Sequence, residues 1–254
     1  MGFAMSSTVF SEILSGLYDN KVVPYLGPGA LFDATNVQTG AAMPADSNSL
    51  ILAMNNGNPI YTHSSTPSDW DYEIFNPAIE IVNGTWYMVL EGKTDSSSFH
   101  TGYAYSDLNE LNWSAHRSMN YIIDNSGNPF LQYVPDRNAL LDISGDISTG
   151  TWRITCWYTS LSDTLSDSSS WLACSNFMLS QSGIHLADPT MIVTNGTKTH
   201  NIIFQYGYDQ ASIYQAYSDL SLDAFYDTVT TGSTPFAFIP DANNPVFTAD
   251  TKSE

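Results

Sequence analysis

The sequence predicts an all-β fold, a five-bladed β-propeller made of four-stranded antiparallel blades. Three observations support this prediction. One segment returns after a fixed offset of 112 residues, and repetition at a fixed period is the signature of repeat architectures. Each copy contains strand-like runs separated by turn signals, and four strands make one propeller blade. Finally, five x-Pro dipeptides each precede an apolar run, at intervals of 49 to 60 residues.

The repeat is visible in three places that share one register. The matched pairs are Asn76-Pro77 with Asp188-Pro189, Asn83-Gly84-Thr85 with Asn195-Gly196-Thr197, and residues 104–108 with the identical residues 216–220. The offset of 112 residues is about twice the spacing of the x-Pro dipeptides. It therefore implies one further unit between the two copies.

The unit after Pro77 reads most clearly as a blade. Asn83-Gly84 between two apolar runs is the strongest short hairpin signal. The runs themselves are rich in aromatic and branched residues, which favour strands. The expected strands are 78–82, 86–90, 102–106 and one at Trp113.

The other blades follow the remaining x-Pro dipeptides. Strands are expected at 31–36, 50–54, 60–64 and 70–74 in the first blade, at 130–134, 139–143, 151–158 and 171–177 in the third, and at 190–193, 202–206, 213–218 and near Phe225 in the fourth. The dipeptides are Gly27-Pro28, Asn76-Pro77, Asn128-Pro129, Asp188-Pro189 and Asn244-Pro245.

The fifth blade has only residues 245–254, enough for one strand. We expect the N-terminal segment 1–24 to supply its missing strands and close the ring, because closure removes free sheet edges. A neighbouring subunit or a longer parent chain are the alternatives. A short helix is expected within residues 7–17. All 254 residues are expected to form one propeller domain.

The chain is strongly acidic, with 26 Asp and Glu against 7 Lys and Arg and a net charge of −19. Such a surface repels nucleic acid and anionic lipid, so neither is an expected partner. No apolar run reaches the length of about 18–20 residues that a membrane span needs. The acidity serves solubility, or else attracts Ca²⁺, the one cofactor that the composition suggests.

The N-terminus lacks the basic and apolar regions of a secretory signal. The composition, rich in polar residues with only 13% charged ones, nevertheless resembles that of extracellular proteins or virion surfaces. Cys156 and Cys174 fall on neighbouring predicted strands and can pair, while two buried free thiols are the alternative. Their spacing does not fit a zinc site, and no metal-ligand motif is present.

Residues 75–79, 83–88 and 102–108 resemble the five-bladed propeller glycosidases of glycoside hydrolase families 43, 32 and 130. The resemblance covers roughly residues 31–225. It implies an acidic pocket at one end of the central axis, with two Asp and one Glu on the innermost strands as base, pKa modulator and acid. Inverting members of this chemistry keep acid and base roughly 6.5–9.5 Å apart.

In a propeller the innermost strands start near the axis, so the residue before each proline is a pocket candidate. Only Asp188 is acidic among these positions, and Asn cannot exchange a proton as a carboxylate does. The catalytic candidates are Asp188, Asp33, Glu73 and Glu91. The substrate-binding candidates are Asn76, Asn128, His185 and Trp86.

Each candidate also has a structural interpretation. An Asp or Asn before proline often only starts a strand by bonding the turn backbone. His185 can be an ordinary hydrogen-bonded histidine. Trp86 and Trp152 can stack on sugar rings or pack between blades.

Two functions fit these observations. The first is a carbohydrate-recognising propeller, either a glycoside hydrolase or a binding protein that acts on glycan or polysaccharide. The second is a non-enzymatic structural or receptor-binding component of a phage or virus particle, such as a tail or decoration protein. That component would assemble with other virion proteins or with copies of itself. Fold alone does not choose between them, because function depends on the site.

Overall fold

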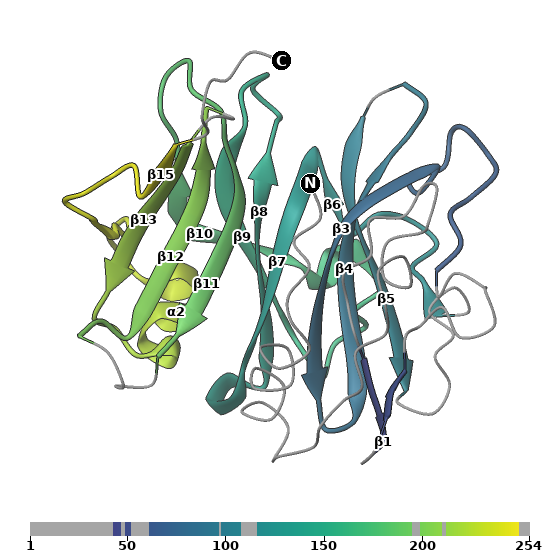
Figure 1. Cartoon of the computed structure of the whole chain (residues 1–254). Helices are drawn as coiled ribbons and strands as arrows, with labels where there is room; N and C mark the ends of the chain where they lie inside the picture. Colours follow the sequence, from purple (N-terminus) through teal and green to yellow (C-terminus); the bar gives the residue numbers. More distant parts are fainter. Residues whose placement is uncertain are drawn as a thin grey trace.

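The computed structural model describes residues 43–46, 49–51, 61–96, 98–107, 116–194, 199–209 and 212–248. Three antiparallel sheets stand side by side along the chain in these residues (Figure 1). Strands β1 (Met43–Asp46) and β2 (Ser49–Ile51) form a separate two-stranded sheet. The all-β prediction is confirmed, but the described residues do not form a closed ring of five blades.

The first sheet has the strand order β3-β4-β5-β6. Its strands are β3 (Glu73–Val82), β4 (Thr85–Lys93), β5 (Phe99–Asp107) and β6 (Ile123–Asp124). The predicted hairpin joins β3 to β4, with φ of 52° at Asn83 and 84° at Gly84. Two positive φ angles are what a type I′ turn requires, so this prediction is confirmed.

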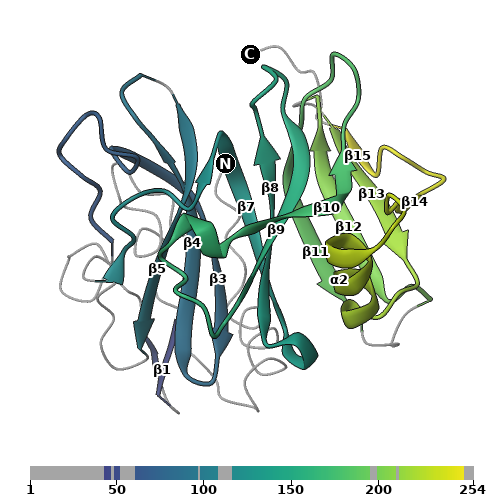
Figure 2. The same ribbon diagram turned by 180° about the vertical axis from the view of Figure 1, so that it is seen from behind.

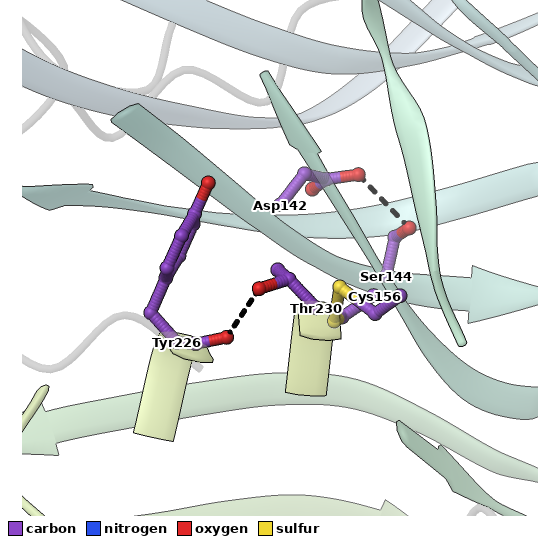
Figure 3. Close-up of a disulfide and its surroundings, with 6 residues drawn as sticks. Asp142, Ser144, Cys156, Tyr226 and Thr230 are labelled. Carbon is purple, nitrogen blue, oxygen red and sulfur yellow. Dashed lines mark hydrogen bonds between the residues drawn. A yellow bond between two sulfur atoms is a disulfide. The ribbon is translucent and has the colours of Figure 1, made fainter. Parts of the chain in front are cut away.

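The second sheet has the order β10-β9-β8-β7. Its strands are β7 (Ser126–Val134), β8 (Ala139–Asp146), β9 (Arg153–Ser160) and β10 (Leu172–Leu179). Short 3-10 helices η3 (Pro135–Arg137) and η4 (Ser168–Ser170) lie in its connections. A disulfide joins Cys156 to Cys174 across β9 and β10 (Figure 3), so the pairing that sequence left open is present.

The third sheet follows the order β11-β12-β13-β14, and β15 also pairs with β13. Its strands are β11 (Leu186–Val193), β12 (Ile202–Tyr208), β13 (Ser212–Ser218), β14 (Ile239–Pro240) and β15 (Phe247–Thr248). The two copies of the 112-residue repeat are therefore the first and third sheets, with the second between them. The inference of an intervening unit is confirmed.

The strand predicted near Phe225 is wrong, because this segment is the helix α2 (Leu222–Thr231). Ser221 caps it, since its Oγ accepts a hydrogen bond from the Ala224 N–H at 3.2 Å. Phe225 and Val229, one turn apart, are completely buried in the core between the second and third sheets. Figure 2 shows α2 lying next to β10.

Residues 245–248, the described part of the predicted fifth blade, belong to the third sheet. β15 instead pairs with β13, and so completes the outer edge of the third sheet together with β14. The Asn244 side chain links the two pieces, because its amide donates to the Gln215 carbonyl and accepts from the Gln215 N–H, both at 2.8 Å. A polar side chain thus replaces the missing ladder bonds.

Several predicted features of the N-terminal part cannot be compared. Residues 1–24, the strand at 31–36 and the strand at Trp113 lie outside the described residues. Residues 61–64 and 70–72 are described and are not strands. Instead Tyr61 and Trp70 pack with Trp86 and Met88 in a core cluster on the first sheet. No helix in the described parts of the chain is long and apolar enough to cross a membrane.

The first strands of the three sheets, β3, β7 and β11, share one irregularity, a β-bulge at the x-Pro dipeptide. The ladders shift register between Phe75 and Ala78, between Gly127 and Phe130, and between Ala187 and Thr190. The residue before each proline is left-handed, with φ of 45° at Asn76, 50° at Asn128 and 51° at Asp188. Asn and Asp tolerate this region better than other non-glycine residues, and proline in a sheet is confined to edges and bulges.

A buried chain of hydroxyl groups lies where the first and second sheets meet. Thr101 donates to Ser126, Ser126 to Ser144, and Ser144 to the Asp142 Oδ2, each at 3.0 Å. None of these residues is more than 1% exposed. Burial, opposed in part by the Ser144 hydrogen bond, raises the pKa of Asp142 to about 7.

The raised pKa of Asp142 predicts a particular dependence of stability on pH. Between the unfolded pKa of about 3.9 and the folded value of about 7, the folded protein holds more protons, so the free energy of unfolding falls as pH rises. Asp142→Asn should remove this contribution, about 4 kcal/mol over that range. Urea unfolding of both proteins from pH 4 to 8 measures it, and parallel curves would contradict the prediction.

The bulges predict a contrast between two substitutions at one residue. Asp188→Ala should lower the free energy of unfolding by about 1–2 kcal/mol, because alanine is strained at positive φ. Asp188→Asn should change it by less than about 0.5 kcal/mol, since asparagine occupies the same conformation at Asn76 and Asn128. Asp163→Ala, in an exposed turn without positive φ, is the control. Equal effects of the two Asp188 variants would argue against the account.

Candidate functional site

The bulges of the first two sheets bring Asn76 and Asn128 together around Glu91. The Asn76 Nδ2 donates to Glu91 Oε2 at 3.1 Å, and the backbone N–H of Asn128 donates to the same oxygen at 2.8 Å. Glu91 comes from β4, next to β3, and is 5% exposed. One carboxylate oxygen is thus held by donors from two separate sheets.

The side-chain amide of Asn128 connects this group to the third sheet. Its terminal atom lies 2.5 Å from the Asn76 Nδ2. With oxygen at that position, Asn128 accepts a hydrogen bond from Asn76. With the amide turned so that nitrogen occupies the position, Asn128 loses that bond and instead donates to Glu91 Oε2 at 3.1 Å and to Asp188 Oδ1 at 3.2 Å. The three x-Pro residues of the described sheets and Glu91 therefore form one cluster of two acids and two amides.

Burial affects both acids of this cluster. It raises the pKa of Glu91, an effect that the hydrogen bonds from Asn128 and Asn76 oppose. The negative charge of Asp188 raises this pKa further, and the nearby Lys93 lowers it. Asp188 is open to solvent, yet partial burial of its carboxylate raises its pKa as well. Both acids therefore hold a proton more readily than free side chains do.

One side of the site is formed by Gly127 and Trp152. A Cβ on Gly127 would lie 2.7 Å from Glu91 Oε2 and 3.1 Å from the Trp152 ring, so only glycine leaves room for both. The Trp152 ring is half-buried and meets Phe99 edge-on, with centroids 5.4 Å apart. The indole thus lies beside the acid pair.

His185 supports this side of the site from the start of the third sheet. Its Nδ1 accepts a hydrogen bond from the Trp152 N–H at 3.3 Å, and the next residue, Leu186, donates its N–H to the Trp152 carbonyl at 2.9 Å. The structure places His185 against the Trp152 backbone. It gives no hydrogen bond from His185 to either acid of the cluster.

The remaining predicted site residues lie elsewhere. Glu73 forms an ion pair with Lys93 at 3.0 Å, two residues along β4 from Glu91. Trp86 is 2% exposed in the core cluster on the other face of the first sheet, so it is not available to stack on a sugar. Of the two tryptophans considered for stacking, only Trp152 reaches the site. Asp33 lies outside the described residues.

The part of the chain that the structure describes contains no cluster of side chains suited to binding a metal ion. No group of three or more His, Cys, Asp or Glu side chains there is arranged to hold an ion. The expectation that acidity attracts Ca²⁺ stays a prediction.

Neither a protein-family model nor a curated protein sequence matches this chain. Solved structures match it in part. An α-L-arabinofuranosidase from Podospora anserina in complex with cellotriose has 10% identity and a TM-score of 0.43, and the match covers 63% of this chain and 50% of that one. A thermostable family-43 glycoside hydrolase has 13% identity, a TM-score of 0.44, and coverage of 69% and 56%.

A family 117 glycoside hydrolase of the marine bacterium Zobellia galactanivorans has 16% identity, a TM-score of 0.46, and coverage of 76% and 63%. This chain thus spans half to less than two thirds of each of these proteins. All three are glycoside hydrolases, the class that the sequence resembles. At such identities and TM-scores, the matches assign no role to any residue, and the site's chemistry must come from its own geometry.

Proposed function

We propose that this protein recognises carbohydrate at the cluster of Asn76, Asn128, Glu91 and Asp188. The observation that carries the proposal is the position of the Asn128 amide. It reaches a carboxylate of the first sheet at 3.1 Å and one of the third at 3.2 Å. Side chains far apart in the sequence thereby present acceptors and donors at one place.

This set of groups matches the chemistry of a sugar ring. Sugar hydroxyls both donate and accept hydrogen bonds, carboxylates accept strongly, and amides do both. Trp152 adds an apolar ring beside Glu91, and aromatic rings commonly supply the large apolar contact in sites of this kind. A chain with a net charge of −19 repels the phosphate backbone of nucleic acid, so nucleic acid is not proposed as a partner.

Glycoside hydrolysis is the second candidate, and the raised pKa values of the two acids favour it. A general acid must keep its proton near the working pH. Glu91, the more buried, would be the acid, and the accessible Asp188 the second carboxylate. Both touch the same Asn128 atom at 3.1 and 3.2 Å, so their nearest oxygens are closer than the 6.5–9.5 Å of inverting enzymes. A glycosidic oxygen could enter only after Asn128 turns away.

The setting in which the protein works stays a prediction. The Cys156–Cys174 disulfide supports an oxidising environment, such as an extracellular space or a particle surface. The virion alternative, with other virion proteins or copies of this chain as partners, stays a prediction too.

A glycan array tests the proposal with three variants. Wild type should bind at least one glycan, and Asp188→Asn and Glu91→Gln should each weaken that binding about tenfold or more. This follows because a hydrogen bond to a charged group contributes about 1.5–3 kcal/mol. Asp188→Asn keeps a residue that tolerates positive φ, so loss of folding does not confuse the result.

Asp163→Asn is the matched control, because it removes the same charge from an exposed turn. It should bind like wild type. No binding of wild type to any glycan on a broad array would refute carbohydrate recognition. Equal binding by wild type and all three variants would show that glycan binds outside this cluster.

A further inference from the structure

The buried hydroxyl chain contains an acid that the proposed site does not use. Asp142 is 0% exposed and receives one hydrogen bond, from Ser144 at 3.0 Å. Its other oxygen, Oδ1, is buried and has no hydrogen-bond partner among the described residues. Figure 3 shows Asp142 and Ser144 joined in this way. A buried acid with so little hydrogen bonding destabilises a fold relative to an apolar residue of similar size.

The hydrogen bonds of the chain all run in one direction. A hydroxyl has a single hydrogen to donate, and Thr101, Ser126 and Ser144 each direct it toward Asp142. Ser126, in the middle, accepts from β5 of the first sheet and donates to β8 of the second. Its position is therefore set by both sheets, and Asp142 is the acceptor at the end.

The middle of this chain adjoins the candidate site. Ser126 directly precedes Gly127, where an added Cβ would lie 2.7 Å from Glu91 Oε2. The next residue is Asn128, whose N–H donates to that oxygen at 2.8 Å. Thr101, at the start of the chain, is the cross-strand partner of Glu91 in the β4–β5 ladder. The hydroxyl chain thus bonds β7 at Ser126, two residues before Asn128, whose N–H donates to the Glu91 carboxylate.

We propose that Asp142 is a positioning residue for Glu91. By accepting from Ser144, it holds Ser126 in place, and Ser126 holds the backbone of residues 126–128 against the Glu91 carboxylate. The inference gains its functional meaning from the proposed carbohydrate site. It can be tested without any glycan, so its failure and that of the proposed function are separate results.

The experiment measures the Glu91 pKa by carbon NMR of the side-chain carboxyl in the full chain. Ser144→Ala and Ser126→Ala should raise this pKa by about 0.5 unit or more, because the bond from the Asn128 N–H stabilises the Glu91 anion and would loosen. Asp188 and Lys93, the charged groups that act on Glu91, are unchanged in these variants. Asp142→Asn keeps an oxygen acceptor for Ser144 and should leave the Glu91 pKa as in wild type.

Ser218→Ala is the matched control, since it removes a buried serine hydroxyl from the third sheet that is not part of the hydroxyl chain. It should leave the Glu91 titration unchanged. Urea unfolding measures the stability of each variant. If the hydroxyl chain had only a structural role, the variants would lose stability while the Glu91 pKa stayed unchanged. An unchanged Glu91 pKa in folded Ser144→Ala and Ser126→Ala overturns the proposal. A shift of the Glu91 pKa in Asp142→Asn as large as that in Ser144→Ala also overturns it, because such a shift would come from loss of the Asp142 charge.

Discussion

The left-handed residue before a proline is the constraint on which the described structure depends. It inserts an extra residue into the first strand of each of three sheets, and Gly, Asn and Asp accept that conformation most easily. The requirement for backbone geometry therefore also selects polar side chains. Because the three bulges occur at matching places in adjacent sheets, Asn76, Asn128 and Asp188 meet. The same positions thus serve both backbone geometry and the candidate site.

The junction of the first and second sheets supplies most of the site. Polar links cross it at several places, among them Glu91 with Asn128, Thr101 with Ser126, and Glu80, whose Oε1 accepts from the Tyr133 N–H at 2.8 Å. Burial raises the pKa of Glu80 and of Glu91. Acids and hydroxyls in this place oppose stability unless they are well bonded. The third sheet adds Asp188, which stays accessible to solvent.

Repetition and turn chemistry made much of the fold predictable. The 112-residue offset placed the first and third sheets, and Asn83-Gly84 marked a turn that only positive φ angles allow. The convergence of Asn76, Asn128 and Asp188 was also predictable, because each stands near the start of the first strand of its sheet. Asn244 was wrongly expected there, and it bonds Gln215 instead. The sequence predicts Glu91 as a candidate acid, but the two donors that hold its carboxylate come from two different sheets and leave no local pattern.

Other features depend on tertiary structure, or on the helix-capping signal at Ser221. α2 follows Ser221 as a cap and buries Phe225 and Val229 one turn apart, a helical pattern that the expectation of a fourth strand obscured. Pro245 lies in the connection between two strand pieces, and the local sequence resembles a true opening. The space around Gly127 and the chain ending at Asp142 arise from contacts between sheets. No local pattern records such contacts.

The central claim is that Glu91 and Asp188 bind one ligand together. Carbon NMR of both carboxyl groups during titration with a bound oligosaccharide tests it most directly. The account predicts that both resonances move and saturate at the same ligand concentration. Movement of only one resonance, or of neither while the oligosaccharide binds, would contradict it.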